Sequence, residues 1–171
     1  MEAQVPEEEL LRAVDEDPKD VDARLRLATY LRKDNNPAKA IPVLKNALEI
    51  DFNNPEIHLQ LGLCWAMSML ENVPTMELWG RDIDEEEIFE NALVNLENAS
   101  ELDPELTEAY NAMGRLYVIR FREEEAIEMF KQSLQVDPAQ LDILEELQEL
   151  TGRPVWNLLD KETYMGEEED I

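Results

Sequence analysis

Apolar and small residues recur along the chain at the three- and four-residue intervals of amphipathic helices, with polar and charged residues between them. Leu141–Thr151 shows the pattern clearly, because Ile143, Leu144, Leu147 and Leu150 are apolar and most of the intervening positions are charged. Similar short stretches fill the chain from Glu7 onwards. The pattern predicts an all-α protein built from short helices.

Asp-Pro pairs divide this helical pattern into units. Asp17-Pro18, Asp103-Pro104 and Asp137-Pro138 each follow a helix-like stretch, and Asp51-Phe52 takes the equivalent place between the first two pairs. The second members of these pairs are 34, 52 and 34 residues apart. A repeat of 34 residues with an insertion in the middle unit explains all three spacings.

Small and aromatic residues occupy matching places in the units. The second unit has His58, Leu61, Gly62 and Trp65, and the third unit has the most complete set: Tyr110, Met113, Gly114, Tyr117, Ala126, Phe130 and Pro138. This arrangement resembles the tetratricopeptide repeat (TPR) family, whose pattern is W-x2-L-G-x2-Y…A-x3-F…P over 34 residues. The first unit departs from it, with Arg24 in place of the first aromatic residue and Phe52 in place of the proline.

The resemblance implies a right-handed superhelical stack of three TPR helical hairpins with capping helices at both ends. Gly62 and Gly114 would let the two helices of a hairpin approach closely. We expect one domain over residues 1–152, followed by an acidic tail over residues 153–171. Its parts are an N-terminal half-repeat (6–20), repeat 1 (21–54), repeat 2 (55–106, with an insertion at about 68–84), repeat 3 (107–140) and a capping helix (141–152).

Helix boundaries are marked by capping residues. Asn36-Pro37 and Asn54-Pro55 each predict an N-cap followed by proline at the first helical position. Asp84 with Glu87 predicts another helix start. Gly152 is expected to end the last helix.

Composition narrows the classes of partner. The formal charge is −26, with 41 acidic and 15 basic residues, so binding to nucleic-acid phosphates is not expected. The longest apolar-rich stretch, Leu59 to Leu70, is shorter than the roughly 20 residues that cross a bilayer. The acidic N-terminus does not resemble a signal peptide. These features predict a cytoplasmic protein without membrane insertion.

Candidate chemistry is sparse. The chain has one histidine and one cysteine, which excludes a disulfide within the chain and any site built on a His or Cys pair. His58 matches the position of a packing aromatic residue, and Cys64 lies on an apolar helix. Glycines are few and do not cluster, so no phosphate-binding loop is predicted. We therefore expect no enzymatic activity, no catalytic residue, no cofactor and no metal.

The resemblance also implies a concave groove, lined by the first helix of each repeat, that receives a peptide or helix of another protein. Its middle would be apolar and its edges basic, which suits a partner with apolar anchors and a few acidic groups. The insertion or the tail filling the groove is the alternative. The expected groove residues are Leu25, Thr29, Arg32, Lys33, Leu59, Leu63, Met67, Asn111, Arg115, Val118 and Ile119.

A second surface is predicted from methionine and tryptophan residues, because both types are common at binding surfaces. These residues are Met76, Trp79 and Trp156. These residues would either contact a partner or pack on the chain itself. The acidic stretch from Asp82 to Gly114 would either keep the protein solvated or attract a basic partner. Together these features predict a non-enzymatic adaptor or assembly factor that binds another protein. The alternatives are a self-associating scaffold that uses the tail or insertion, and a client-specific chaperone for a secreted or basic protein.

Overall fold

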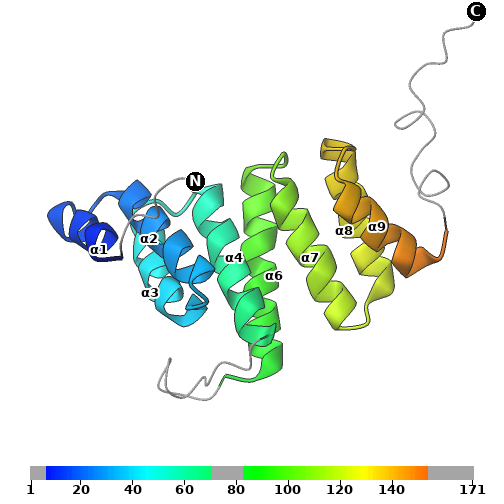
Figure 1. Ribbon diagram of the computed structural model, residues 1–171, viewed down its shortest axis with the longest axis horizontal. Helices are drawn as coiled ribbons and strands as arrows, with labels where there is room; N and C mark the ends of the chain where they lie inside the picture. The colour runs from blue at the N-terminus through cyan, green and yellow to red at the C-terminus, as the bar shows by residue number, and fades with distance from the viewer. Residues whose placement is uncertain (1–6, 71–82, 154–171) are drawn as a thin grey trace, which may run out of the picture. The chain divides into compact units, whose positions relative to one another are not determined.

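The computed structural model describes residues 7–70 and 83–153, and within these ranges its regular secondary structure is α-helical throughout (Figure 1). The predicted all-α class is therefore confirmed. The chain divides into two compact units, Met1–Asp103 and Pro104–Ile171. The single-domain organisation expected for residues 1–152 stays a prediction.

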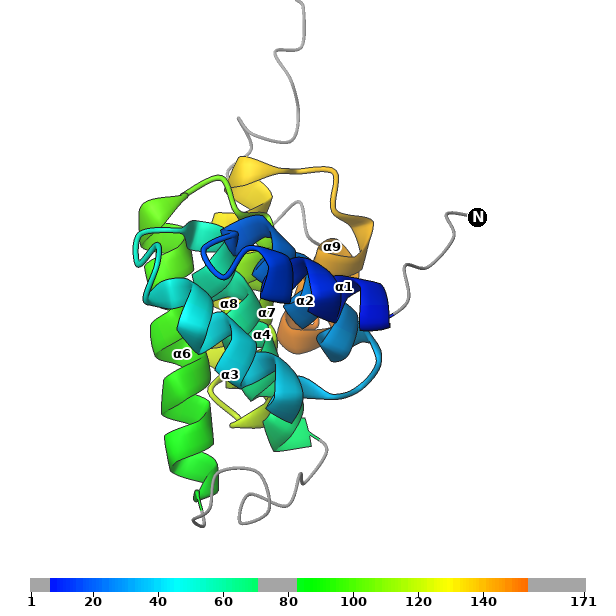
Figure 2. The same cartoon turned by 90° about the vertical axis from the view of Figure 1, so that its left-hand side faces the viewer.

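The first unit is built from helical hairpins. Helix α2 pairs with α3, and α4 pairs with α6; α3 also contacts α4, and α1 packs against α2 (Figures 1 and 2). Consecutive hairpins therefore stack within this unit. The helices are α1 (Glu7–Glu16), α2 (Val21–Lys33), α3 (Pro37–Leu48), α4 (Pro55–Leu70) and α6 (Glu85–Leu102).

The second unit consists of α7 (Thr107–Ile119), α8 (Glu123–Val136) and α9 (Leu141–Thr151). Helices α7 and α8 form a hairpin, and α9 packs against α8. Gly152 follows α9 with φ +62° and its N–H donates to the carbonyl oxygen of Gln148 at 2.9 Å. The predicted glycine stop is thus confirmed, because this left-handed conformation favours glycine.

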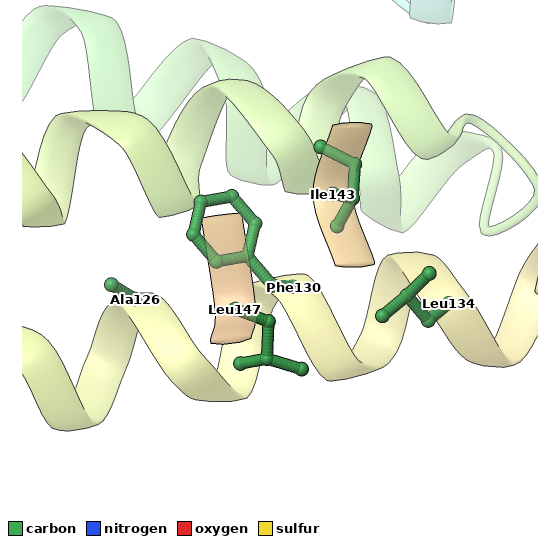
Figure 3. Close-up of a cluster of buried hydrophobic side chains, with 5 residues drawn as sticks. All are labelled: Ala126, Phe130, Leu134, Ile143 and Leu147. Atoms are coloured by element: carbon green, nitrogen blue, oxygen red, sulfur yellow. The ribbon is translucent and has the colours of Figure 1, made fainter. Parts of the chain in front are cut away.

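One buried hydrophobic cluster of the second unit lies between α8 and α9. Figure 3 shows side chains from both helices meeting there. Each is at most 1% exposed, so substitutions in this cluster act directly on packing. Its members are Ala126, Phe130, Leu134, Ile143 and Leu147.

Two of the three predicted helix starts are capped by the expected side chain. Asn54 Oδ1 accepts from the backbone N–H groups of Glu56 and Ile57 at 3.1 and 3.3 Å. Asp84 Oδ1 accepts from the N–H of Glu87 at 2.8 Å. Asp20 caps α2 in the same manner through Ala23, a cap that the sequence analysis did not name.

Asn36 differs from the expectation. It occupies the N-cap position of α3, yet its side chain makes no capping hydrogen bond. Its amide nitrogen instead donates to the backbone oxygen and to Oδ2 of Asp34, both at 3.0 Å. The Asn36 side chain is thus turned towards the preceding loop, where its hydrogen bonds with Asp34 replace the capping hydrogen bond.

Two glycines are required by close helix packing. A Cβ atom on Gly62 would lie 2.6 Å from Leu96 Cγ, across the α4–α6 hairpin. A Cβ atom on Gly114 would lie 2.5 Å from Phe130 Cε1, across the α7–α8 hairpin. Both distances are far inside van der Waals contact, so the structure supports the predicted close approach of the helices.

The hairpin that carries the predicted insertion has the longest helices described. Helix α4 has 16 residues and α6 has 18, compared with 13 and 14 for α7 and α8. The insertion was expected to begin near Ser68, but Ser68 is still helical and its hydroxyl donates to the Cys64 carbonyl oxygen at 2.9 Å. Part of the extra sequence therefore lengthens the hairpin.

Candidate functional site

The first unit positions seven of the predicted groove residues on two neighbouring helices, α2 and α4. Lys33 is exposed, whereas Leu25, Thr29, Arg32, Leu63 and Met67 are half-buried. Leu59 is different, because it is only 1% exposed and belongs to the core. The expectation that Leu59 contributes to an exposed apolar strip is therefore wrong: its side chain fills the helix packing and is not available to a partner.

A polar chain fixes Arg32 in place. Arg32 Nε donates to Gln60 Oε1 at 2.8 Å, and Gln60 Nε2 donates to Glu56 Oε1 at 2.8 Å. Gln60 is 4% exposed, so its buried amide is satisfied at both ends. Because Gln60 is neutral, this hydrogen bond fixes the position of the Arg32 guanidinium without compensating its charge.

Helix α4 has an unusual composition for a surface helix. Glu56 is its one charged residue, and its inward and outward faces are both largely apolar. Leu63, Ala66 and Met67 nevertheless remain partly exposed. A helix that is apolar on all sides is typically covered on all sides. Together with Leu25 of α2, these residues leave an apolar surface on the first unit, with Arg32 and Lys33 at the end of α2.

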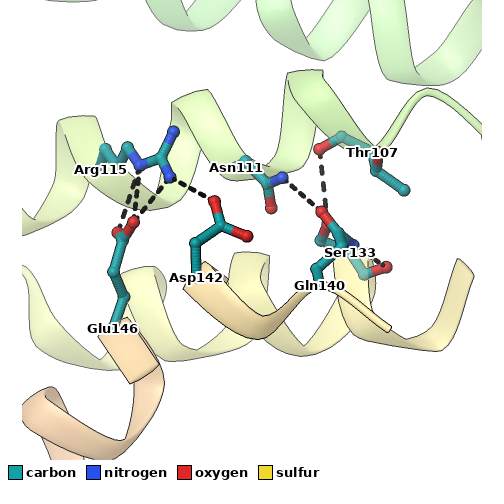
Figure 4. A network of polar contacts seen from close by, with 7 residues as sticks. All are labelled: Thr107, Asn111, Arg115, Ser133, Gln140, Asp142 and Glu146. Carbon is teal, nitrogen blue, oxygen red and sulfur yellow. Dashed lines mark hydrogen bonds and ion pairs between the residues drawn. The ribbon is translucent and has the colours of Figure 1, made fainter. Parts of the chain in front are cut away.

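The second unit pairs Arg115 with acidic residues of α9 (Figure 4). Arg115 Nε and an Nη atom both contact Glu146 Oε1, at 2.9 and 2.6 Å, and the same Nη atom contacts Asp142 Oδ2 at 3.2 Å. The hydrogen bond with Glu146 is the main cause that raises the pKa of Arg115. Two carboxylates of the same unit therefore already pair with Arg115, and its role as a cation for an acidic partner stays a prediction.

Asn111 takes part in a neighbouring hydrogen-bond chain. Its amide donates to Gln140 Oε1 at 2.7 Å, and Gln140 Nε2 donates to the hydroxyl of Ser133 at 2.9 Å (Figure 4). These contacts join α7 to the loop before α9, so Asn111 is a structural contact of this unit. Val118 and Ile119, the last two predicted groove residues, are 37% and 39% exposed at the end of α7.

Sequence reasoning missed a hollow in the second unit. A pocket is lined by Val118, Glu123, Glu146, Glu149 and Leu150. Only Val118 was a predicted site residue, because residues 141–152 were interpreted as a capping helix. The acidic residues at helical spacing in that segment were the available signal.

The remaining predicted surface cannot be placed on these units. Met76, Trp79 and Trp156 lie outside the described residues. Over residues 7–70 and 83–153, no group of His, Cys, Asp and Glu side chains is arranged to hold a metal ion. None of the helices in the same ranges combines the length and the apolar character that crossing a membrane requires.

His58 and Cys64, the candidate base and nucleophile, are both buried. His58 is 8% exposed, and its Nε2 donates to the Phe52 carbonyl oxygen at 3.0 Å while Nδ1 lies 3.3 Å from Asn95 Oδ1. Cys64 is fully buried, and burial raises the pKa of its thiol to about 12. A thiol in that state is a poor nucleophile at neutral pH.

Comparison with known proteins identifies the architecture. A tetratricopeptide repeat family model matches residues 21–54 and 107–140. The chain is 29% identical over 127 residues to interferon-induced protein with tetratricopeptide repeats 2 of Mus musculus, an alignment that covers 73% of this chain and 27% of the relative. The chain thus spans about a quarter of the length of the curated relatives it matches.

Solved structures agree with this result. YrrB, described as a TPR protein with an unusual peptide-binding site, superposes with a TM-score of 0.63 at 24% identity, covering 82% of this chain and 63% of YrrB. A structure of IFIT1 with m7Gppp-AAAA gives a TM-score of 0.66 at 21% identity, covering 84% of this chain and 31% of IFIT1. These similarities show the superhelical TPR fold. The chain therefore carries tetratricopeptide repeats at residues 21–54 and 107–140.

Proposed function

We propose that this chain is a non-enzymatic adaptor or assembly factor that binds a peptide or amphipathic helix of another protein on its first unit. The site is the α2–α4 face, defined as Leu25, Thr29, Arg32, Leu63 and Met67. The observation that carries the proposal is the partial exposure of apolar residues on α4, a helix with one charged residue.

The chemistry of the face suits a particular kind of segment. Apolar side chains of an amphipathic helix would cover Leu25, Leu63 and Met67, in the manner of helix-in-groove recognition. Arg32 is already held by Gln60, so a carboxylate of the partner would meet a preorganised cation. Lys33, exposed at the end of α2, offers a second positive charge nearby.

The YrrB comparison and the charge of the chain support a protein or peptide ligand over a nucleic acid. The name of the YrrB structure describes a peptide-binding site, and TPR proteins are in general binding modules. The IFIT1 structure holds m7Gppp-AAAA, but this chain carries a formal charge of −26. Because phosphate binding requires clustered Lys and Arg, we do not extend RNA binding to this chain.

Catalysis is not part of the proposal. His58 and Cys64 are both engaged in the interior, and no cofactor or metal is required for a surface that binds through packing and hydrogen bonds. A cytoplasmic location, self-association through the tail or insertion, and a chaperone role remain predictions.

The test is capture of partners by the full chain and two matched variants. Met67→Glu places a charge in the α2–α4 face, and Val94→Glu makes the same kind of change at a 53% exposed position of α6. We expect a protein retained by the wild type and by Val94→Glu to be lost with Met67→Glu. Equal retention by both variants would contradict the assigned face. Circular dichroism melts establish that both variants fold.

A mass measurement separates this function from a self-associating scaffold. Light scattering of the full chain and of a chain that ends at Arg153 would show whether the mass in solution depends on residues 154–171. The adaptor proposal predicts that each chain has the mass of its own monomer. A drop to monomer on truncation would favour the scaffold instead.

A further inference from the structure

The pocket in the second unit is a concave site with mixed chemistry. It has a volume of about 390 Å³ and is lined by Val118, Glu123, Glu146, Glu149 and Leu150, hereafter the α7–α9 pocket. Ligand pockets in proteins span roughly 300–1,000 Å³, so this one is at the small end of that range. It is large enough for a single long side chain and its neighbours, and small for a cofactor.

The apolar side of the pocket is anchored to the core. Leu150 packs against the cluster that contains Phe130 and Leu147, both fully buried. Val118, 37% exposed, faces the pocket from the last turn of α7. A ligand group that lies between these two residues would therefore contact a fixed apolar surface.

The polar side of the pocket carries uncompensated negative charge. Glu146 is already bound by Arg115. Glu123 and Glu149 make no ion pair or side-chain hydrogen bond with any residue in the described ranges 7–70 and 83–153. Arg122, which follows α7 and is the closest cation in sequence to Glu123, pairs with Glu125 at 2.7 Å and lies over the Tyr117 ring at 4.7 Å.

The turn that borders the pocket adds an exposed aromatic residue. Phe121 lies between Val118 and Glu123 in the chain and is 90% exposed. Its φ is +57°, a left-handed conformation that is uncommon for a bulky residue. Exposure of a phenyl ring to water is unfavourable. Contact with a partner would stabilise the ring, and contact with a cation would do so most.

From these features we infer that the α7–α9 pocket binds a basic segment of another protein by taking up an arginine or lysine side chain. The aliphatic stem would lie along Val118 and Leu150, and the cationic head would reach Glu123 and Glu149. Arginine suits the site better, because its planar guanidinium binds carboxylates in pairs and stacks on aromatic rings such as Phe121.

Charge argues against the other occupants. Residues 154–171 contain six acidic residues and one lysine, and a second copy of the chain carries a charge of −26, so both would be repelled from an acidic pocket. The same overall charge would attract a basic partner and speed its association. The side chains of the described residues, including these carboxylates, do not form a cluster suited to a metal ion.

This inference goes beyond the proposed function. It assigns a second site, in the other unit, to a partner of opposite charge from the one expected at the α2–α4 face. The proposed function and this inference can fail separately, because Met67→Glu should leave binding at the α7–α9 pocket unchanged.

The test uses the ¹⁵N-labelled full chain and a synthetic probe, the acetylated nonapeptide amide Gly-Ser-Gly-Arg-Leu-Arg-Gly-Ser-Gly. A second peptide replaces both arginines with citrulline, which keeps the shape and removes the charge. Titrations followed by amide chemical shifts run at about 0.15 M salt, where exposed charges are screened beyond roughly 8 Å. The pocket variant is Glu123→Gln/Glu149→Gln, and the control variant is Glu124→Gln/Glu145→Gln, which removes two exposed charges from the same helices.

We expect saturable shifts at the lining residues with the arginine peptide and none with the citrulline peptide. Losing two charge-assisted contacts should raise the Kd of the pocket variant about tenfold, and the control variant should change it no more than about twofold. Equal weakening of both variants, or shifts spread over all acidic surfaces, would overturn the site. Spermidine that gives the same shifts with equal or higher affinity would overturn the protein-segment assignment in favour of a polyamine.

Discussion

Gly114 supports a quantitative prediction about how the repeats pack. Replacing Gly114 with alanine would place Cβ at 2.5, 2.7 and 2.9 Å from three atoms of the Phe130 ring. Non-bonded carbon atoms prefer a separation of about 3.5–4.0 Å, so the ring or the helix must move by roughly 1 Å. Phe130 has little room to move, because it is fully buried among Ala126, Leu134, Ile143 and Leu147.

The magnitude follows from two opposing effects. Adding a methyl group to a tightly packed interior costs about 1–3 kcal/mol. Alanine is the better helix former by about 1 kcal/mol, which offsets part of that cost. We therefore expect Gly114→Ala to lower the free energy of unfolding by up to about 2 kcal/mol.

Urea unfolding followed by circular dichroism measures this change directly. With a slope typical of small proteins, the midpoint should fall by up to about 1 M. Phe130→Leu in the same chain removes the ring edge, so the double variant should lose less stability than the sum of the single variants. An increase in stability of about 1 kcal/mol for Gly114→Ala, as at an exposed helical glycine, would refute the close-packing argument.

Three further predictions concern caps, ion pairs and the buried thiol. Asp20→Ala should lower the free energy of unfolding by about 1 kcal/mol, because it removes a capping hydrogen bond. Asn36→Ala should lower it by less than about 0.5 kcal/mol, because Asn36 makes no capping hydrogen bond. Urea unfolding of both variants measures the difference, and equal losses would contradict it. Arg115→Met should lower the free energy of unfolding by about 0.5–1 kcal/mol at low salt and by less at 0.5 M NaCl, because its side chain is half exposed; a loss that does not depend on salt would argue against the ion pairs as its cause. Burial raises the pKa of the Cys64 thiol from 9.0 to about 12, so the folded state holds this proton more tightly than the unfolded state. The free energy of unfolding should therefore fall between pH 9 and about 12 more steeply in the wild type than in Cys64→Ala, and parallel pH profiles would contradict the burial effect.

Much of the fold could be predicted because its determinants are local in sequence. Asn54 and Asp84 mark helix starts, and Gly152 marks a helix end, through capping geometry that depends on a few neighbouring residues. The spacing of Gly62 and Gly114 within their units indicated close helix pairs, and the structure shows how close they are. These features recur with the repeat, so each unit supported the interpretation of the others.

The candidate site was less predictable, for two physical reasons. Helix α4 is apolar on nearly all sides, so its periodicity does not distinguish the buried Leu59 from the partly exposed Leu63 one turn later. Whether Arg115 is free depends on which side chains of α9 face α7, and this is set by tertiary packing of segments about 30 residues apart. Because Glu146 is distant along the chain, the sequence alone does not indicate its ion pair with Arg115.

Site-specific photo-crosslinking can show whether another protein binds the α2–α4 face. The photoreactive residue p-benzoylphenylalanine would replace Leu63 in one sample and the exposed Val94 of α6 in another. After irradiation in host lysate, mass spectrometry identifies the crosslinked segment. We expect the Leu63 position to crosslink to one protein, at a segment with apolar residues at helical spacing, and the Val94 position not to crosslink to it. Equal crosslinking from both positions, or crosslinking from Val94 and none from Leu63, would contradict it.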